Sequence, residues 1–582
     1  MNTSNKITEL KNWKFALDQT GYGEGTGWAG KYFDDSNWAD VKTNTCWETY
    51  EAAMFDYEGM GWFRTKFTPK EQNKQYILHF NGVGGMAKVF VNGSLAGTYE
   101  NRYLPFEINI TRWVWTAGEN TIAVLVDNSF RGKTHLTGGS KVEWVLYGGL
   151  THAVWVEERR VFHLDHVRVD TDHCGNAKIT VTVGNHAVVT DLECELVAEI
   201  EELNAVQTKQ AFCSYGTSCK IAFEFKDTGA KPWSPDAPNL YTVKVSMFRN
   251  GELVHWVKHR IGFRTITTKG TDILLNGKPL LLKGANRYDE YAPYGICPPE
   301  ECIREDMLAM KKAGMNLIRT HYPQDPIHYD LADELGLMYM IEIPLNWWAP
   351  TEDDTLADHV GLLNEAVNCL DDTYFWHCNH PSWTIWSVGN ECAHSMPAAQ
   401  AMFRMLAERI RGLDCGRLVT YAANRALLNS TELDFCDILC MNYYSGIKSE
   451  SVEDFPVQLE TVLRGKLKTA QELYPNVPHV MSEFGYVCVA GIRGSTQFGR
   501  YAEDFGTTFL KKKCEEFLAD PQMKGLIIWS WADYRHRRDF KSGPVGMGIS
   551  ATYGPWGLVT MDRKPKQALL NTITEVYNNW NV

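Results

Sequence analysis

Two glutamates occupy positions where they could act together on a glycosidic bond. Glu391 follows the strand-like run 383–388 through Gly389 and Asn390, and Glu483 follows the run 479–482. Hydrolysis with retention needs two carboxyl groups about 5 Å apart, one as nucleophile and the other as acid and base. A single glutamate at a strand end could instead cap the following helix. The pair predicts a two-carboxylate hydrolase with Glu391 as the acid/base and Glu483 as the nucleophile.

The elements that position this pair have the pattern of a barrel. Buried strand-like runs occur at 280–284, 316–319, 338–342, 383–388, 417–421, 438–442, 479–483 and 526–530, and amphipathic helical patterns at 302–313, 327–335 and 398–411. Parallel strands that alternate with helices over roughly 300 residues form a (β/α)8 barrel, whose functional groups lie at the C-terminal ends of its strands. By this count Glu391 ends strand four and Glu483 ends strand seven.

The part of the chain before the barrel has the pattern of all-β domains. Strand-like runs at 75–80, 88–91, 121–126 and 153–157 are separated by turns such as Asn92-Gly93, and a second set lies at 166–170, 178–183, 195–199 and 241–246. Such spacing is typical of β-sandwiches. The predicted fold is multidomain, β plus α/β. A jelly-roll β-sandwich is expected over 1–162, an immunoglobulin-like β-sandwich over 163–265 and a catalytic (β/α)8 TIM barrel over 266–582.

Composition and charge exclude several classes of partner. The formal net charge of −13 argues against nucleic acid, which needs a basic surface. The longest apolar runs, such as 525–529, are far shorter than the roughly 18 residues that span a bilayer, and the first residues lack the apolar stretch of a secretion signal. The 15 cysteines include no Cys-x-x-Cys pair. We therefore expect reduced thiols, no metal site, no membrane partner and a cytoplasmic location.

Several motifs give the chain a resemblance to glycoside hydrolase family 2, the family of β-galactosidases and β-glucuronidases, over essentially its whole length. The motifs are Trp386-Ser-Val-Gly-Asn-Glu391, Met481-Ser-Glu-Phe-Gly485, Gly284-Ala-Asn-Arg-Tyr-Asp289, Ile318-Arg-Thr-His-Tyr-Pro323, Tyr147-Gly-Gly-Leu150 and Trp529-Ser-Trp-Ala-Asp533. The resemblance implies the same three domains in the same order. It also implies the same roles for Glu391 and Glu483.

The resemblance assigns further residues to the site. It implies that Asn390 holds the sugar's 2-hydroxyl, Tyr444 hydrogen-bonds the nucleophile and Trp529 forms the floor of the sugar site. Arg319 is expected to keep the nucleophile ionised, Asp289 to point into the pocket and Glu143 to reach the sugar hydroxyls. His321 is either a ligand contact or a buried structural histidine.

The identity of the sugar stays open. The Asn-x-Lys clamp with which glucuronidases bind the substrate carboxylate is missing before Arg563-Lys-Pro-Lys566. Basic residues that could replace it are Lys448, Arg535, Arg537 and Arg538, because arginine binds carboxylates bidentately. These arginines could instead pair with structural acids such as Asp533. A hexuronide, a β-galactoside and an α-L-arabinoside all remain candidates, with Trp556 as the selector of a neutral sugar.

Other functional classes have weaker support. A catalytically silent carbohydrate-binding protein would have no need of both glutamates, and the Gly-x-Ser-x-Gly, His-Glu-x-x-His and P-loop motifs of other hydrolases do not occur. The expected substrate is a small glycoside or an oligosaccharide, and no cofactor is required. Mg²⁺ or Na⁺, which some members of the family use, is not indicated, and a homo-oligomer is an open alternative.

Overall fold

The computed structural model describes residues 2–72, 74–130, 135–136, 142–414, 416–424, 431–537 and 553–581. Two compact units emerge from the pattern of contacts. The first comprises Met1–Ser129, Leu146–Thr265 and Phe375–Pro381, and the second comprises Phe130–Val145, Ile266–Tyr374 and Ser382–Val582. No helix among the described residues is long and apolar enough to cross a membrane.

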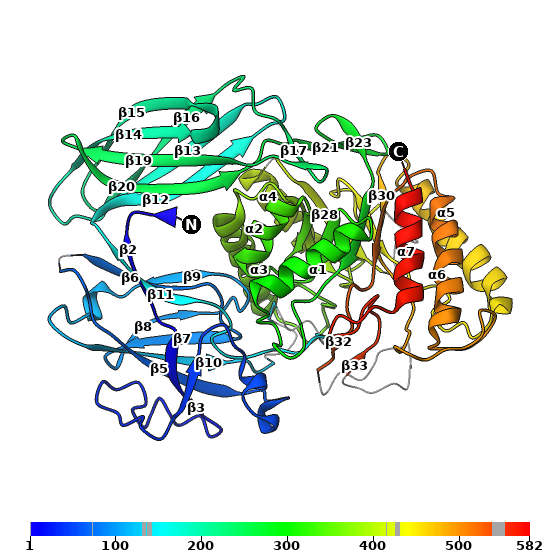
Figure 1. The fold of residues 1–582 in the computed structure, drawn as a ribbon, viewed down its shortest axis with the longest axis horizontal. Helices are drawn as coiled ribbons and strands as arrows, with labels where there is room; N and C mark the ends of the chain where they lie inside the picture. The colour runs from blue at the N-terminus through cyan, green and yellow to red at the C-terminus, as the bar shows by residue number, and fades with distance from the viewer. Residues whose placement is uncertain are drawn as a thin grey trace. The chain divides into compact units, whose positions relative to one another are not determined.

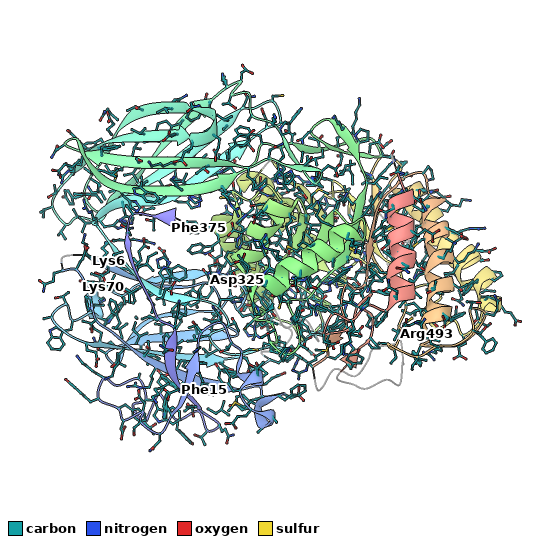
Figure 2. The ribbon with its side chains drawn as sticks, viewed as in Figure 1. Lys6, Phe15, Lys70, Asp325, Phe375 and Arg493 are labelled. Carbon is teal, nitrogen blue, oxygen red and sulfur yellow. A yellow bond between two sulfur atoms is a disulfide. The ribbon has the colours of Figure 1, made fainter. Side chains whose placement is uncertain are left out.

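The first β-sandwich of the first unit consists of two antiparallel sheets, with strand orders β4-β3-β5-β10-β7-β8 and β2-β11-β6-β9. Its strands are β2 (Lys6–Glu9), β3 (Asn12–Leu17), β4 (Ala39–Lys42), β5 (Met60–Phe67), β6 (Gln75–Phe80), β7 (Met86–Val91), β8 (Ser94–Tyr99), β9 (Phe106–Asn109), β10 (Asn120–Asp127) and β11 (Val154–Arg159). Short 3₁₀ helices lie at Trp47–Thr49, Ala52–Met54 and Thr111–Trp113. Phe15, labelled in Figure 2, is buried in the core of this sandwich.

The predicted hairpin turn at Asn92-Gly93 is confirmed. Val91 of β7 pairs with Ser94 of β8, and both turn residues have positive φ angles, 53° and 88°. A two-residue turn with positive φ at both positions matches the twist of the strands that it joins.

A second β-sandwich pairs the sheet β1-β20-β19-β14-β15 with the sheet β12-β13-β16 (Figure 1). Its strands are β1 (Asn2–Thr3), β12 (Phe162–Thr171), β13 (Ala177–Asn185), β14 (Leu192–Ile200), β15 (Ala205–Cys213), β16 (Thr217–Phe225), β19 (Tyr241–Arg249) and β20 (Glu252–Ile261), with a 3₁₀ helix at Glu201–Leu203 and the short pair β17 (Trp233–Ser234) and β18 (Ala237–Pro238). Inward residues of both sheets alternate with outward ones and form one core.

One expectation about the cysteines is wrong. Cys213, the last residue of β15, and Cys219 on β16 form a disulfide, with Cα atoms 5.7 Å apart. The chain turns back between these two strands over a few residues. This turn brings the two side chains within bonding reach, which spacing along the sequence alone did not indicate.

The second unit contains a closed barrel of eight parallel strands. They are β24 (Leu282–Asn286), β25 (Leu317–Thr320), β26 (Met338–Glu342), β27 (Trp383–Asn390), β28 (Leu418–Ala423), β29 (Leu439–Asn442), β30 (His479–Phe484) and β31 (Met523–Ile528). Every residue of β26 through β30 is buried, as expected for parallel strands that are covered on both faces. The predicted barrel is therefore confirmed, with strand bounds shifted by a few residues.

Helices and short sheets accompany the barrel strands. The helices are α1 (Glu300–Lys312), α2 (Pro326–Leu335), α3 (Leu356–His377), α4 (Pro397–Leu413), the 3₁₀ helix Val452–Asp454, the π-helix η6 (Pro456–Leu463), α5 (Arg464–Leu473), α6 (Glu503–Leu518) and α7 (Gln567–Asn579). The sheet β21 (Ile266–Lys269), β22 (Asp272–Leu275) and β23 (Lys278–Leu280) precedes the barrel, and β32 (Tyr534–Arg535) pairs with β33 (Tyr553–Gly554) after it. In Figure 1, α6 and α7 lie side by side, in agreement with their many contacts.

Local sequence explains where these helices begin and end. The side chain of Asp325 accepts a hydrogen bond from the backbone N–H of Ile327, and Pro326 is the first residue of α2. The helix stops at Gly336, whose φ of 72° is left-handed and suits glycine.

Lys513 on α6 is an unusual buried charge. Its ammonium lies 5.8, 5.4 and 5.9 Å from the ring centres of Tyr444, Phe509 and Phe517, and no described residue gives it a hydrogen bond. Burial lowers the pKa of Lys513 to about 7. The folded protein therefore holds this proton much less tightly than the unfolded chain does.

We expect Lys513→Met to stabilise the fold in a pH-dependent way. Unfolded lysine titrates near 10.4, so unfolding takes up a proton between about pH 7 and pH 10. The destabilisation by Lys513 has its full size below about pH 7. It disappears as the pH approaches the pKa of lysine in the unfolded chain. Methionine keeps the apolar stem, and the gain should be about 2–4 kcal/mol near pH 6 and close to zero near pH 10.

Thermal unfolding at the two pH values measures this effect. Lys511→Met, at an exposed position of the same helix, is the matched control and should change the melting temperature little at either pH. An equal gain from Lys513→Met at both pH values would show that the charge is not the cause.

Candidate active site

The structure places both predicted catalytic glutamates at the C-terminal end of the barrel. Glu391 directly follows β27, the fourth barrel strand, and Glu483 lies within β30, the seventh. Glu391 has a left-handed φ of 50°. Gly389 has φ 154°, and a Cβ there would lie 2.9 Å from the carbonyl oxygen of Leu345, so only glycine fits this turn.

A continuous chain of hydrogen bonds connects the two carboxylates. Arg319, fully buried on β25, donates from Nη1 to Glu483 Oε1 (2.7 Å) and from Nη2 to Asn390 Oδ1 (2.9 Å). Asn442, the last residue of β29, donates from Nδ2 to the same Asn390 oxygen and to Glu391 Oε1, both at 2.9 Å. The predicted residues Arg319, Asn390, Glu391 and Glu483 thus form one connected group.

Glu391 accepts hydrogen bonds at both carboxylate oxygens. In addition to the bond from Asn442, Oε2 accepts from Trp347 Nε1 at 3.1 Å and from Asn424 Nδ2 at 2.9 Å. These donors fix the direction of the carboxyl group. Such fixed geometry is what an acid that protonates a leaving group needs.

Glu483 is held from both sides of its carboxylate. Arg319 binds Oε1, and the hydroxyl of Tyr444 donates to Oε2 at 2.9 Å. Burial raises the pKa of Glu483 to about 7, the nearby Glu391 carboxylate adds to this rise, and Arg319 and His321 oppose it. The carboxyl group of Glu483 therefore binds a proton more readily than that of an exposed glutamate.

Glu342 supports this arrangement from β26. Its Oε2 accepts from Arg319 Nη2 (2.8 Å) and from Ser387 Oγ (2.7 Å), and its Oε1 lies 2.8 Å from Nδ1 of His321. Burial alone would raise the pKa of Glu342, but Arg319 and His321 hold it below its ordinary value. The other ring nitrogen of His321, Nε2, lies 3.7 Å from Glu483 Oε1.

Aromatic and acidic side chains form the neighbouring part of the site. Trp529 donates from Nε1 to the hydroxyl of Tyr534 (3.0 Å), which donates to Glu143 (2.5 Å). His536 Nε2 lies 2.9 Å from the same Glu143 oxygen, and these partners outweigh burial and lower the pKa of Glu143. The ring of Trp529 is 5.1 Å from that of His321, so three of the predicted contacts, Glu143, His321 and Trp529, lie close together.

Two further aromatic rings lie beside residues of the site. Trp144, next to Glu143 in the chain, stacks on His321 with ring centres 5.5 Å apart and an interplanar angle of 15°. Trp556 meets the ring of Tyr444 edge to face at 5.5 Å. Trp556 therefore lies beside the tyrosine that binds Glu483.

Asp289 follows the first barrel strand and is buried beside Gln324. Its carboxyl group is buried and accepts a hydrogen bond from Gln324, whose own oxygen accepts from Tyr339. Burial raises the pKa of Asp289 to about 7, against the opposing effect of Arg287. No described hydrogen bond joins Asp289 to Glu391 or Glu483.

The structure describes three of the four predicted basic residues. The guanidinium of Arg537 lies over the ring of Phe130, 4.4 Å from its centre, and Arg535 is buried with its backbone N–H donating to Glu290. Lys448 is exposed in the turn after β29. Arg538 lies outside the described residues. Asp533, which we considered as a partner of the arginines, forms an ion pair with Lys566 at 2.6 Å.

Three residues that bind the carboxylates were not among the predicted contacts: Trp347, Asn424 and Asn442. Asn424 follows β28 and Asn442 ends β29, so the rule that barrel sites lie at strand ends would have indicated both. Trp347 lies beyond the end of β26, with a positive φ of 52°, and no sequence signal marks it.

Family models match almost the whole chain. Residues 266–582 match the TIM barrel domain of glycosyl hydrolases family 2, residues 162–264 match glycosyl hydrolases family 2, and residues 41–159 match the galactose-binding domain-like segment of glycosyl hydrolase 2. The chain therefore belongs to glycosyl hydrolase family 2, a family of glycoside hydrolases. The barrel with its β-sandwich domains is the architecture of that family, and the resemblance seen in the motifs is confirmed.

Particular relatives are glycosidases. A putative beta-glucuronidase of Formosa agariphila is 31% identical over 62% of this chain and 43% of that protein, and a beta-glucuronidase of Paenibacillus borealis is 25% identical over 96% and 94%. The chain spans less than half the length of the first curated relatives that it matches. The crystal structure of a GH2 beta-galacturonidase from Eisenbergiella tayi, bound to galacturonate, has a TM-score of 0.84 with 24% identity, over 99% of this chain and 98% of that one.

Proposed function

We propose that this protein is a retaining exo-glycosidase that removes a terminal β-linked sugar, with Glu483 as the nucleophile and Glu391 as the acid/base. The observation that carries this proposal is the difference between the two carboxylates. Glu483 is bound by the cation Arg319 and by Tyr444, whereas the donors to Glu391 among the described residues are the neutral N–H groups of Trp347, Asn424 and Asn442. A cation favours the anionic nucleophile, and neutral donors tolerate a protonated acid on the other carboxyl group.

The reaction proceeds in two displacements. Glu391 donates its proton to the glycosidic oxygen while Glu483 attacks the anomeric carbon, and the aglycone leaves. A water molecule then gives its proton to Glu391 and attacks the glycosyl-enzyme, which frees Glu483. Both steps pass through a sugar with developing positive charge, which the anionic Glu483 and the flanking π-faces of Trp529 and Trp144 would stabilise. No organic cofactor takes part.

Tyr444→Phe is expected to lower kcat/KM by about 10- to 100-fold, because a hydrogen bond to a charged group contributes about 1.5–3 kcal/mol. The variant should also move the acid limb of the pH profile to higher pH, since loss of a donor to the anion raises the pKa of Glu483. Steady-state rates across pH measure both effects. Tyr443→Phe, which removes the hydroxyl of the adjacent buried residue, is the matched control and should change neither.

For the sugar, we propose a β-galactoside or a β-linked hexuronide, the classes named in the relatives. An α-L-arabinoside, whose pyranose ring has the galacto configuration without the hydroxymethyl group, is the alternative. A uronide requires a cation at the substrate carboxylate, and the groups available for that are Lys448, Arg535, Arg537 and Arg538. A neutral sugar would make Trp556, beside Tyr444, the selector.

Release of p-nitrophenol from a panel of aryl glycosides tests the proposal. The panel contains the β-galactoside, β-glucuronide, β-galacturonide, β-glucoside, β-mannoside and both α-L-arabinosides, each assayed with wild type and Glu483→Gln. Turnover of one galacto-configured or uronide member, absent in the variant, supports the proposal. A folded wild-type protein that turns over none of them would favour the silent carbohydrate-binding alternative.

A further inference from the structure

Two histidines and an aspartate meet on the second β-sandwich, within the first unit of the chain. His163 and Asp165 belong to β12, and His186 directly follows β13, the neighbouring strand (Figure 1). The register between these strands shifts between Leu164 and His166, so Asp165 is the extra residue of a bulge. A bulge redirects a side chain, and here it brings Asp165 toward both histidines.

The distances within this group fit the coordination of a small cation. Nε2 of His163 lies 2.8 Å from Asp165 Oδ1, Nε2 of His186 lies 3.3 Å from the same oxygen, and all three ligand atoms lie within 4.8 Å of one another. Ligands of tetrahedral zinc, at about 2.0–2.2 Å from the metal, stand roughly 3.3 Å apart. The two nitrogen–oxygen distances, 2.8 and 3.3 Å, are therefore close to the separation of two ligands on one zinc ion.

The tautomer of His163 leaves its metal-facing nitrogen without a hydrogen. Nδ1 lies 2.9 Å from the carbonyl oxygen of Arg160, which can only accept, so Nδ1 carries the hydrogen. In the neutral ring Nε2 then presents a lone pair to the carboxylate of Asp165. Two lone pairs 2.8 Å apart repel unless a proton or a metal ion lies between them. An Nδ1–H that donates to a backbone carbonyl is the usual orientation of a histidine ligand.

The two histidines share one carboxylate partner. The rings of His163 and His186 are stacked, with centres 4.7 Å apart and planes 9° apart. Nε2 of each ring faces the same oxygen of Asp165, and the side chain of His163 is only 3% exposed. A single metal ion would satisfy both lone pairs and the carboxylate together.

Gly184 makes the space for this group. A Cβ at Gly184 would lie 2.5 and 2.6 Å from the two oxygens of Asp165 and 2.6 Å from Nε2 of His186. The backbone of Gly184 is not left-handed, so its conformation does not require glycine. The atoms of Asp165 and His186 exclude a side chain at Gly184. Glycine is therefore needed at this position to leave room for the proposed ligands.

From this geometry we infer that His163, Asp165 and His186 form a binding site for one divalent transition-metal ion of the zinc type. Imidazole and carboxylate ligands suit Zn²⁺, and three protein ligands leave a position for water. The side chain of His186 is 42% exposed, so the ion can enter from solvent. The site links β12 to the end of β13, and its effect is on the stability of the sandwich.

Binding to the full-length, untagged protein tests this inference after treatment with EDTA and removal of the chelator. We expect calorimetric titration with Zn²⁺ to show one site per chain that His186→Ala and Asp165→Asn each weaken by at least about tenfold. His173→Ala and Asp170→Asn, on the same sandwich but outside the group, are the matched controls and should bind as wild type does. Gly184→Ala keeps all three ligands and should also weaken binding, with its fold checked by circular dichroism.

Titration with Co²⁺ gives an independent readout that separates this site from the cysteines. Imidazole and carboxylate ligation should give visible d–d bands without a thiolate charge-transfer band. These bands should be lost in His186→Ala. The inference is overturned if wild type binds no stoichiometric Zn²⁺, or if the His186 and Asp165 variants bind it as tightly as wild type. A thiolate band that persists in those variants would likewise overturn it by placing the metal on cysteine.

Discussion

Glu483→Gln is expected to lower the rate of glycoside hydrolysis on the order of 10⁵-fold, because in the proposed mechanism the carboxylate of Glu483 forms the covalent intermediate. The substitution keeps the shape of the side chain and removes only its charge. Arg319 would keep its ion pair with Glu342 at 2.8 Å, so the buried guanidinium retains one carboxylate partner. Initial rates with the preferred aryl glycoside measure the loss.

Two comparisons make this result specific. Glu408→Gln, at an exposed position of α4, should keep the wild-type rate. Glu483→Gln should also fail to trap a fluorinated, slow-turnover glycoside as a covalent adduct detectable by intact mass, whereas wild type should trap one. A variant that retains the wild-type rate would remove Glu483 from the mechanism.

The barrel was predictable because its strands are buried on both faces. Their sequences are continuous apolar runs that end at polar residues, and each of the eight expected runs overlaps a strand of the structure. Helix α3 was not expected at 356–377, because its apolar residues are spread around its circumference instead of forming one stripe. The disulfide between Cys213 and Cys219 also escaped prediction, since it depends on how two strands face each other.

The central residues of the candidate site were also predictable from the barrel pattern. Asn390 and Glu483 lie at strand ends, where barrel sites form, and Arg319 lies on the second barrel strand within a recognisable motif. The contacts of the arginines after strand eight could not be predicted from strand-end positions. Arg537 lies over Phe130, a residue about 400 positions earlier in the chain, and no local pattern indicates such a contact. The same holds for Trp347, which reaches Glu391 from a loop.

The loss of rate in Glu391→Gln is expected to depend on the leaving group of the substrate. Loss of general acid catalysis should lower the rate by about 10³-fold for glycosides of poor leaving groups, which need a proton. A dinitrophenyl glycoside leaves without one, so its first step should proceed at nearly the wild-type rate, and the glycosyl-enzyme should accumulate because the base for the water is also gone. Added azide needs no base and should restore turnover, giving a β-glycosyl azide. Glu483→Gln should show neither the leaving-group dependence nor the rescue.

The pH profile of Glu391→Gln provides the second half of this test. In wild type the rate should fall at high pH as the acid loses its proton and at low pH as Glu483, whose pKa burial raises to about 7, gains one. In Glu391→Gln the high-pH limb should vanish. The low-pH limb should remain, because Glu483 must still lose its proton before it can attack the anomeric carbon. A high-pH limb that persists unchanged, together with no azide rescue, would assign the acid/base role to a residue other than Glu391.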